Sequence, residues 1–262
     1  MSESWRIQVP KALHSALSGV ATTAFTRDMK SEGVPKMTGD RVFCVCYHLA
    51  LPAVAYVLST GGYYEAALAK MGVATYALAA NRKLMLHALD VLYGVRWAVQ
   101  DVVQLSGKGG YLTSSKVAFF HYTLHTSVTW MLVYATPGLP NGIVPREMAG
   151  ATIMVVGGLL QCVPEVQRYL FKRKPENAGK LHTGGLFSLA RFINTSGHVL
   201  RDVGATILTR TPHLIPIFFM VDYPLMTVLC ATETVAYMRA KYKAAYAAYE
   251  ATTPSLFIPG VW

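Results

Sequence analysis

The chain carries little charge for its size. Charged residues make up 15% of its 262 residues, whereas hydrophobic residues make up 53%. An ordinary soluble domain has roughly a quarter of its residues charged. The mean hydropathy is +0.33. These values favour an all-α polytopic membrane protein over the alternative, a soluble helical domain with a large core.

Acidic side chains are scarcer than basic ones. The chain has 24 Lys and Arg against 14 Asp and Glu, which gives a net charge of +10. In membrane proteins such an excess usually lies in loops on the side that is not translocated. A nucleic-acid partner is not expected, because the basic residues are scattered between apolar runs. The one compact cluster, Lys172 to Lys174, has no aromatic residue among its members.

Metal ligands are also few. The four cysteines lie in or beside apolar segments, and Cys44 and Cys46 form a CxC motif without a second pair. A metal site is therefore not expected, and the cysteines are interpreted as reduced and buried. His121 and His125 are four residues apart in an apolar segment. Without a neighbouring carboxylate or third histidine, they are expected to form hydrogen bonds between helices.

Six or seven membrane helices are expected, because the apolar runs approach the ~20 residues that cross a bilayer. The run at 149–163 contains Gly150, Gly157 and Gly158, which favours close packing against another helix. Residues 165–183 are expected to form a polar, basic connection, and the tail from 233 to 253 an amphipathic helix. The candidate spans are 43–62, 84–105, 117–135, 149–163, 199–209 and 214–231, with 66–80 as a short seventh.

The first forty residues are basic and moderately polar, and they lack the apolar run of a secretory signal. Residues 11–25 contain no acid and are rich in Ala, Ser and Thr, as in a mitochondrial targeting helix. We therefore divide the chain into a basic N-terminal extension, 1–40, and a membrane domain, 41–262.

Three blocks of the chain carry a family pattern. Residues 92–96 read LYGVR, residues 165–180 read EVQRYLFKRKPENAGK and lead into GLFSLARFINTSGH at 185–198, and the tail from 241 reads KYKAAYAAY and ends IPGVW. In this order and spacing they resemble the steroid 5-alpha-reductase and sterol reductase family. The resemblance implies a membrane helix bundle of reductase type, with residues 165–262 as the cofactor-binding region.

The family resemblance also implies NADPH as the cofactor, from which a hydride passes to a polarised C=C bond. Lys172, Arg173 and Lys180 would then pair with its phosphates. Arg191 and Asn194, three apart on one helix face, would hold its amide and ribose. Tyr242 and Tyr249 occupy positions that contact the cofactor in the family.

Several letters of the family motif are changed. Phe192 replaces a histidine, Thr195 a tyrosine, His198 an acid and Lys243 a glycine. A phenylalanine forms no side-chain hydrogen bond, and a threonine hydroxyl does not replace a phenol as proton donor. We therefore expect that the fold is kept, that the reductase chemistry is lost and that no residue is catalytic.

The most favoured function is thus a structural or lipid-binding subunit of a membrane complex, in the mitochondrial inner membrane rather than the endoplasmic reticulum. Its partners would be membrane lipids and other subunits, with no nucleic acid, and in this role it would need no cofactor. Arg96 and Asp101 lie deep in an apolar segment and are expected to form salt bridges within the bundle or with such partners. Asp202 is expected to bind a cofactor or to pair with a partner subunit. The alternative is an active NAD(P)H-dependent reductase of an enone lipid. A third class, the isoprenoid-type carboxyl methyltransferases, shares the arginine-to-tyrosine helix motif.

Overall fold

A computed structural model describes residues 38–103, 124–210 and 230–260, and these residues form helices and no strands. The all-α prediction is therefore confirmed for this part of the chain. Two 3-10 turns, η3 (Pro175–Asn177) and η4 (Gly185–Ser188), join the last turn of α8 to α9. The helices are α3 (Thr38–Thr60), α4 (Tyr63–Lys70), α5 (Ala80–Val103), α7 (Leu124–Tyr134), α8 (Pro145–Arg173), α9 (Ile193–Thr209), α11 (Cys230–Tyr242) and α12 (Ala244–Thr252).

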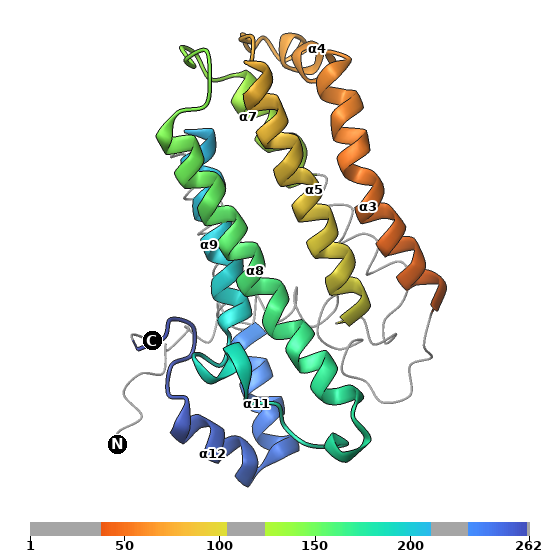
Figure 1. Cartoon of the computed structure of the whole chain (residues 1–262), viewed down its shortest axis with the longest axis vertical. Coiled ribbons are helices and arrows are strands. Elements are labelled where there is room, and N and C mark those ends of the chain that lie inside the picture. Colours follow the sequence, from red (N-terminus) through yellow and green to blue (C-terminus); the bar gives the residue numbers. More distant parts are fainter. Residues whose placement is uncertain (1–37, 104–123, 211–229, 261–262) are drawn as a thin grey trace, which may run out of the picture.

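Four long helices form the body of the molecule (Figure 1). Helix α3 packs on α5, α5 on α8, and α8 most extensively on α9. Helices α4 and α7 lie at one end of this body, and α11 and α12 at the other. Near the α4 end an aromatic core is built on the fully buried Trp130, whose ring lies 6.1 Å from that of Tyr64 and 6.0 Å from that of Tyr134.

Two described helices are long and apolar enough to cross a bilayer, the segment Val42–Thr60 of α3 and the whole of α8. They indicate a membrane protein, but the expected six or seven spans remain a prediction. Helix α5 has the length, but five charged residues interrupt it, and α9 has only 17 residues. The expected spans 117–135 and 214–231 lie partly or largely outside the described residues.

Glycines bring α8 and α9 into backbone contact. A Cβ atom on Gly150 would lie 2.7 Å from the amide nitrogen of Leu208, and one on Gly157 would lie 2.5 Å from that of Arg201. From the other side, a Cβ on Gly197 would lie 2.6 Å from the nitrogen of Gln161. The predicted close packing of this glycine-rich helix is confirmed. Gly158 is different, since a Cβ there would meet nothing within 4 Å.

Helix α8 is longer than expected. The sequence predicts a polar connection from residue 165, whereas the helix continues beyond Pro164 to Arg173. Its 29 residues span about 43 Å at 1.5 Å per residue, more than the ~30 Å hydrocarbon core of a bilayer. The last turns can thus project into water, where a helix tolerates polar residues.

The aromatic tail is two helices rather than one. The chain breaks at Lys243, which has φ 44° and ψ −118°, a backbone conformation that favours glycine. The prediction of one amphipathic helix over 233–253 is therefore wrong. Tyr246 and Tyr249 are buried, whereas Tyr242 is half-buried beside exposed lysines.

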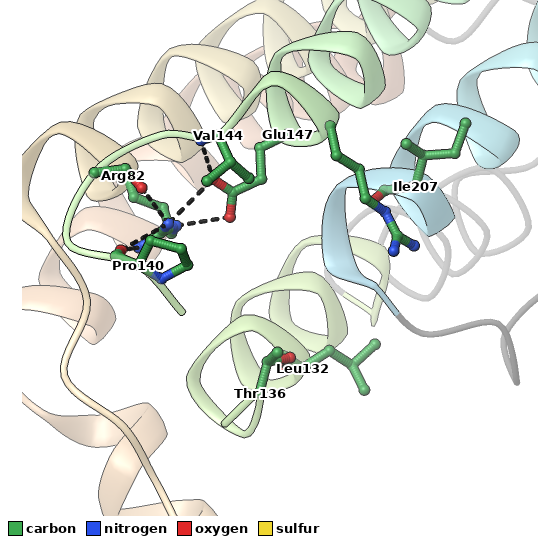
Figure 2. Close-up of polar contacts among 9 residues, drawn as sticks. Arg82, Leu132, Thr136, Pro140, Val144, Glu147 and Ile207 are labelled. Atoms are coloured by element: carbon green, nitrogen blue, oxygen red, sulfur yellow. Dashed lines mark hydrogen bonds and ion pairs between the residues drawn. The ribbon is translucent and has the colours of Figure 1, made fainter. Parts of the chain in front are cut away.

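The end of the bundle near α4 is fixed by a buried ion pair (Figure 2). Arg82 donates from Nε to Oε1 of Glu147 at 2.8 Å and from Nη1 to the carbonyl of Pro140 at 3.1 Å. Glu147 also accepts the amide of Val144 at 3.0 Å, at the first turn of α8. The sequence places Arg82 in a polar break between spans, but the structure buries it as the joint between α5 and α8.

The glycine contact predicts that Gly157→Ala destabilises the protein. The added methyl group would overlap the backbone of α9, and such overpacking typically costs about 1–3 kcal/mol. Gly158→Ala is the matched control, because its methyl group meets open space and alanine favours a helix. Thermal unfolding of the detergent-purified variants should show a lower Tm for Gly157→Ala alone. Equal Tm values would contradict the close contact.

The break at Lys243 predicts that Lys243→Gly stabilises the C-terminal region. A non-glycine residue in a sparsely populated region costs of order 1–3 kcal/mol, which exceeds the entropy that glycine loses on folding. Amide hydrogen exchange of residues 244–252 should slow in this variant. In Lys243→Ala it should not, because the Cβ atom remains. Faster exchange in Lys243→Gly would exclude the strained turn.

Candidate cofactor site and buried charges

The predicted cofactor residues lie at the end of the bundle occupied by α11 and α12 (Figure 1). Here the last turns of α8, the 3-10 turn η4, the start of α9, helix α12 and the tail to Gly260 pack together. The tail is hydrogen-bonded along its backbone to the start of α9. The amide of Arg191 donates to the carbonyl of Ser255 at 3.1 Å, and that of Phe192 to the carbonyl of Leu256 at 2.7 Å.

Arg191 connects α9 to α12. Its side chain is buried, Nη1 donates to Oε1 of Glu250 at 2.5 Å, and Nη2 donates to the carbonyl of Pro254 at 3.3 Å. Glu250 is shared with Arg239 of α11, whose Nε lies 3.0 Å from Oε2. Arg191 is thus part of an ion-pair network that holds both C-terminal helices.

Asn194 points to another element. Its amide nitrogen donates to Oε1 of Glu165 on α8 at 2.9 Å, and Glu165 is buried and also accepts from Arg168. The prediction that Arg191 and Asn194 share one helix face is wrong. Helix α9 begins at Ile193, so Arg191 lies in the preceding turn and its guanidinium reaches α12 instead.

Tyr249 is a buried structural donor. Its hydroxyl donates to the carbonyl of Phe187 in η4 at 2.6 Å. Burial raises the pKa of Tyr249 above its ordinary value, with Tyr246 as a further cause, so the phenol stays protonated and keeps this bond. Beside it, Phe192 packs on Phe257 with ring centroids 5.7 Å apart. Aromatic packing thus replaces the polar contact that a histidine would make.

The remaining predicted residues form an exposed basic surface. Lys172 donates to the hydroxyl of Tyr242 at 3.2 Å and to the carbonyl of Lys180, and its ammonium lies 5.2 Å from the centre of the Tyr242 ring. Arg173 turns away, and its guanidinium lies 5.7 Å from the centre of the Tyr169 ring on its own helix.

Burial, and then the nearby Arg168 and Lys172, lower the pKa of His182, which favours a neutral imidazole at pH 7.

Two residues of this region have larger roles than the sequence suggested. Glu250, the shared partner of both arginines, carries no motif letter and was missed. Gln167 belongs to a quoted motif without an assigned role. Its Oε1 accepts the amide of Leu186 at 2.9 Å, and Gly185, at φ 62°, packs against it.

The donor groups fit the phosphate part of NADPH better than its nicotinamide part. Lys172 and Lys180 are exposed and could face phosphates. Asn194 and Tyr249, and two nitrogens of Arg191, are already bonded to protein acceptors. The described arrangement therefore does not fit the whole cofactor, and no hydride-transfer step is derived from it.

A second set of ionisable side chains is buried inside the helix body. Nδ1 of His48 on α3 lies 2.6 Å from Oδ2 of Asp101 on α5, and Trp130 donates to Asp90 at 2.7 Å. On α9, Arg201 pairs with Asp202. The expected intrabundle pairing of Asp101 is confirmed, with His48 as its partner. Asp202, which was expected to meet a cofactor or a partner subunit, pairs with its neighbour Arg201 instead.

Among the residues that the structure describes, no three His, Cys, Asp or Glu side chains are grouped as metal ligands. His121 lies outside the described residues, as does the side chain of His125. Their predicted role between helices stays a prediction.

Comparison with known proteins gives a family and one partial relative. A segment of this chain is 37% identical over 82 residues to "Probable O-methyltransferase ustE" of Ustilaginoidea virens. The match covers 30% of this chain and 29% of that protein, so the chain spans less than a third of the length of the curated relative. No solved structure matches the chain.

The model of a family described as "Protein of unknown function (DUF1295)" matches residues 54–253, more than half of the chain. The match includes the motif blocks at 92–96 and 165–198 and most of the C-terminal block. The chain therefore belongs to the DUF1295 family, a steroid 5-alpha-reductase-like family.

Proposed function

We propose that this protein is a lipid-binding subunit of a membrane complex that keeps the reductase-like fold without its reductase chemistry. One observation carries the proposal. The polar groups that would hold the nicotinamide half of NADPH bond to the protein instead, Arg191 to Glu250, Asn194 to Glu165 and Tyr249 to the carbonyl of Phe187. The bonds of Arg191 and Tyr249 hold α12 in place and that of Asn194 joins α9 to α8, so these groups serve stability rather than binding of a cofactor.

The changed motif letters support the same conclusion. Phe192 packs on an aromatic ring. Thr195 lacks the phenol that would donate a proton to the carbanion formed after hydride transfer. Removal of several polar groups around a reacting centre costs several kcal/mol of transition-state stabilisation, about 2.7–4 for a single oxyanion donor. A reductase that lacked both side chains would be slow by orders of magnitude.

We also propose that the α12 end faces the untranslocated side of the mitochondrial inner membrane. Lys172, Arg173 and Lys174 lie exposed in a row at this end, whereas the other end exposes Lys70 and Arg146 singly and buries Arg82 in an ion pair. Such asymmetry follows the positive-inside tendency. The endoplasmic reticulum is the alternative, and fluorescence microscopy of the tagged chain distinguishes the two.

The proposed loss of chemistry predicts that the purified protein neither binds NADPH nor oxidises it with an enone sterol. The measurement is an NADPH titration in a neutral detergent, followed by the absorbance at 340 nm with substrate, with an active steroid reductase as positive control. A micromolar Kd that is lost in Arg191→Ala, together with turnover above background, would overturn the proposal and favour the active reductase.

Glu250→Gln makes this test sharper. The substitution removes the carboxylate that neutralises Arg191, so a cofactor site closed only by that pair would open. We expect no NADPH binding in this variant either, because Asn194 and Tyr249 remain bonded to the protein. NADPH binding by Glu250→Gln but not by the wild type would mean that the Arg191–Glu250 ion pair alone prevents cofactor binding.

The partial match to an O-methyltransferase favours a second candidate, a membrane methyltransferase that uses S-adenosylmethionine. This function predicts a micromolar Kd for S-adenosylmethionine, measured by isothermal titration, and a lower affinity in Asn194→Ala. We expect no such binding if the lipid-binding function is correct. A saturable binding isotherm would replace the first proposal by this one.

A further inference from the structure

A cavity of about 200 Å³ lies between α5, α8 and α9. Leucine, valine and methionine side chains form most of its wall. Among the described residues that line it, only Arg96 and Arg201 are charged, and Tyr93 and Cys162 are the other polar side chains. Both arginines are more than nine-tenths buried, with 8% and 3% of their surface exposed. The burial of two cations in an apolar wall calls for an explanation, because a buried charge is costly unless it is paired.

Arg96 has spare hydrogen-bond donors. Its guanidinium lies 4.1 Å from the centre of the Trp97 ring, and Nη2 donates to Gln100 on the same helix. The atoms Nε and Nη1 are buried and have no hydrogen-bond partner in the described structure. Because Nε carries one hydrogen and Nη1 two, three N–H groups are left.

The acidic side chains that act on Arg96 are Asp101, Asp202 and Glu165. Each of them has a closer partner of its own. Asp101 bonds to His48, Asp202 to Arg201, and Glu165 to Arg168 and Asn194. None of the three lines this cavity. The spare donors of Arg96 therefore have no carboxylate of their own, and in this structure they lie buried behind the apolar wall of the cavity.

Arg201 adds a further donor to the same wall. Its Nη2 donates to Oδ1 of Asp202 and lies 3.5 Å from Nδ1 of His198, but its Nε is buried without a hydrogen-bond partner. The guanidinium of Arg201 lies 4.6 Å from the centre of the Tyr93 ring, and that of Arg96 lies 5.9 Å from the same centre. The two cations thus gather around one aromatic side chain from two helices.

We propose that this cavity binds a single-chain lipid with a carboxylate head, and that the guanidinium groups of Arg96 and Arg201, which border the cavity, turn toward the head to donate hydrogen bonds to its oxygens. A carboxylate accepts only, with about four lone-pair sites, and matches the unpaired donors in number and in sign. The hydroxyl of a sterol offers two lone pairs and no charge. This inference names the lipid class for the lipid-binding role proposed above, and so it rests on that function.

The shape of the cavity suits a chain that is only partly enclosed. A pocket for a whole drug-sized ligand measures roughly 300–1,000 Å³, so about 200 Å³ encloses the head and the first carbons. Leu92, Val95 and Leu159 line the cavity and are also exposed on the helix surface. The rest of an acyl chain can leave between α5 and α8 along these apolar side chains.

Gly158 allows the cavity to be filled without damage to the fold. It lines the cavity, and a Cβ atom there meets nothing within 4 Å. Gly158→Leu should therefore occupy the space of the ligand. Val156→Leu is the matched control, because Val156 lies exposed on the same helix and does not line the cavity.

The test measures binding of radiolabelled palmitate to the full chain in nanodiscs of neutral lipid, with hexadecanol and cholesterol as uncharged probes. We expect saturable palmitate binding that weakens at least about tenfold in Gly158→Leu and in Arg96→Gln, since charge-assisted hydrogen bonds are the strong ones. Val156→Leu should bind as the wild type does. Hexadecanol should bind about tenfold more weakly than palmitate, and Arg96→Gln should leave its affinity unchanged.

A second measurement leaves the arginines in place. With the other three cysteines replaced, palmitate should slow the modification of Cys162 by N-ethylmaleimide several-fold, whereas cholesterol should not. Palmitate binding that survives Gly158→Leu, or an unprotected Cys162, would overturn the site.

Equal binding of hexadecanol and palmitate would overturn the carboxylate class and leave the lipid-binding function intact. If no lipid bound and NADPH were oxidised, both proposals would fail.

Discussion

The backbone contact between α8 and α9 is the constraint on which the rest of this structure depends. Gly150 and Gly157 on one helix face Gly204 and Gly197 on the other, and each pair is seven residues apart, about two helical turns. Because side chains are absent at the interface, the two helices cannot slide without loss of van der Waals contact. This fixed pair sets the start of α9 beside the end of α8, where Asn194 meets Glu165. It also sets Arg201 on the wall shared with α5.

The C-terminal helices depend on that pair through a few polar bonds. An ion-pair network runs from the buried Arg191 through Glu250 to the exposed Arg239. The tail adds backbone hydrogen bonds to the residues just before α9. A sharp turn at Lys243 lets α12 fold back so that Tyr249 reaches η4. The motif that this segment resembles has glycine at this place. Because Lys243 adopts the turn all the same, the contacts of α12 outweigh its strain.

The sequence predicted the features that depend on composition and local pattern. Apolar runs gave the helical class and the two long spans, and the glycines of 149–163 gave the close packing. It could not give features set by three-dimensional neighbours. Arg82 looks like a charge in a polar break, and only the fold reveals Glu147 beside it. Arg191 and Asn194 have helical spacing, but the helix starts between them. The length of α8 was missed because charged residues were taken to end a span, although a helix can continue into water.

The buried arginines at the two ends of the bundle are paired with carboxylates, whereas Arg96 in its body is not hydrogen-bonded to one, and this difference bears on function. At Arg82 the guanidinium finds a carboxylate and two backbone carbonyls, so the cation is fully used in joining helices. At Arg191 the same chemistry joins the C-terminal helices, leaving only Nε without a partner. At Arg96 the protein supplies a stacked indole and one amide oxygen, and three N–H groups stay unpaired. An unpaired buried donor costs about 1–3 kcal/mol. Among these three arginines, Arg96 has the most unpaired donors in the described structure, and for this reason we propose it as the group that meets an acceptor from outside.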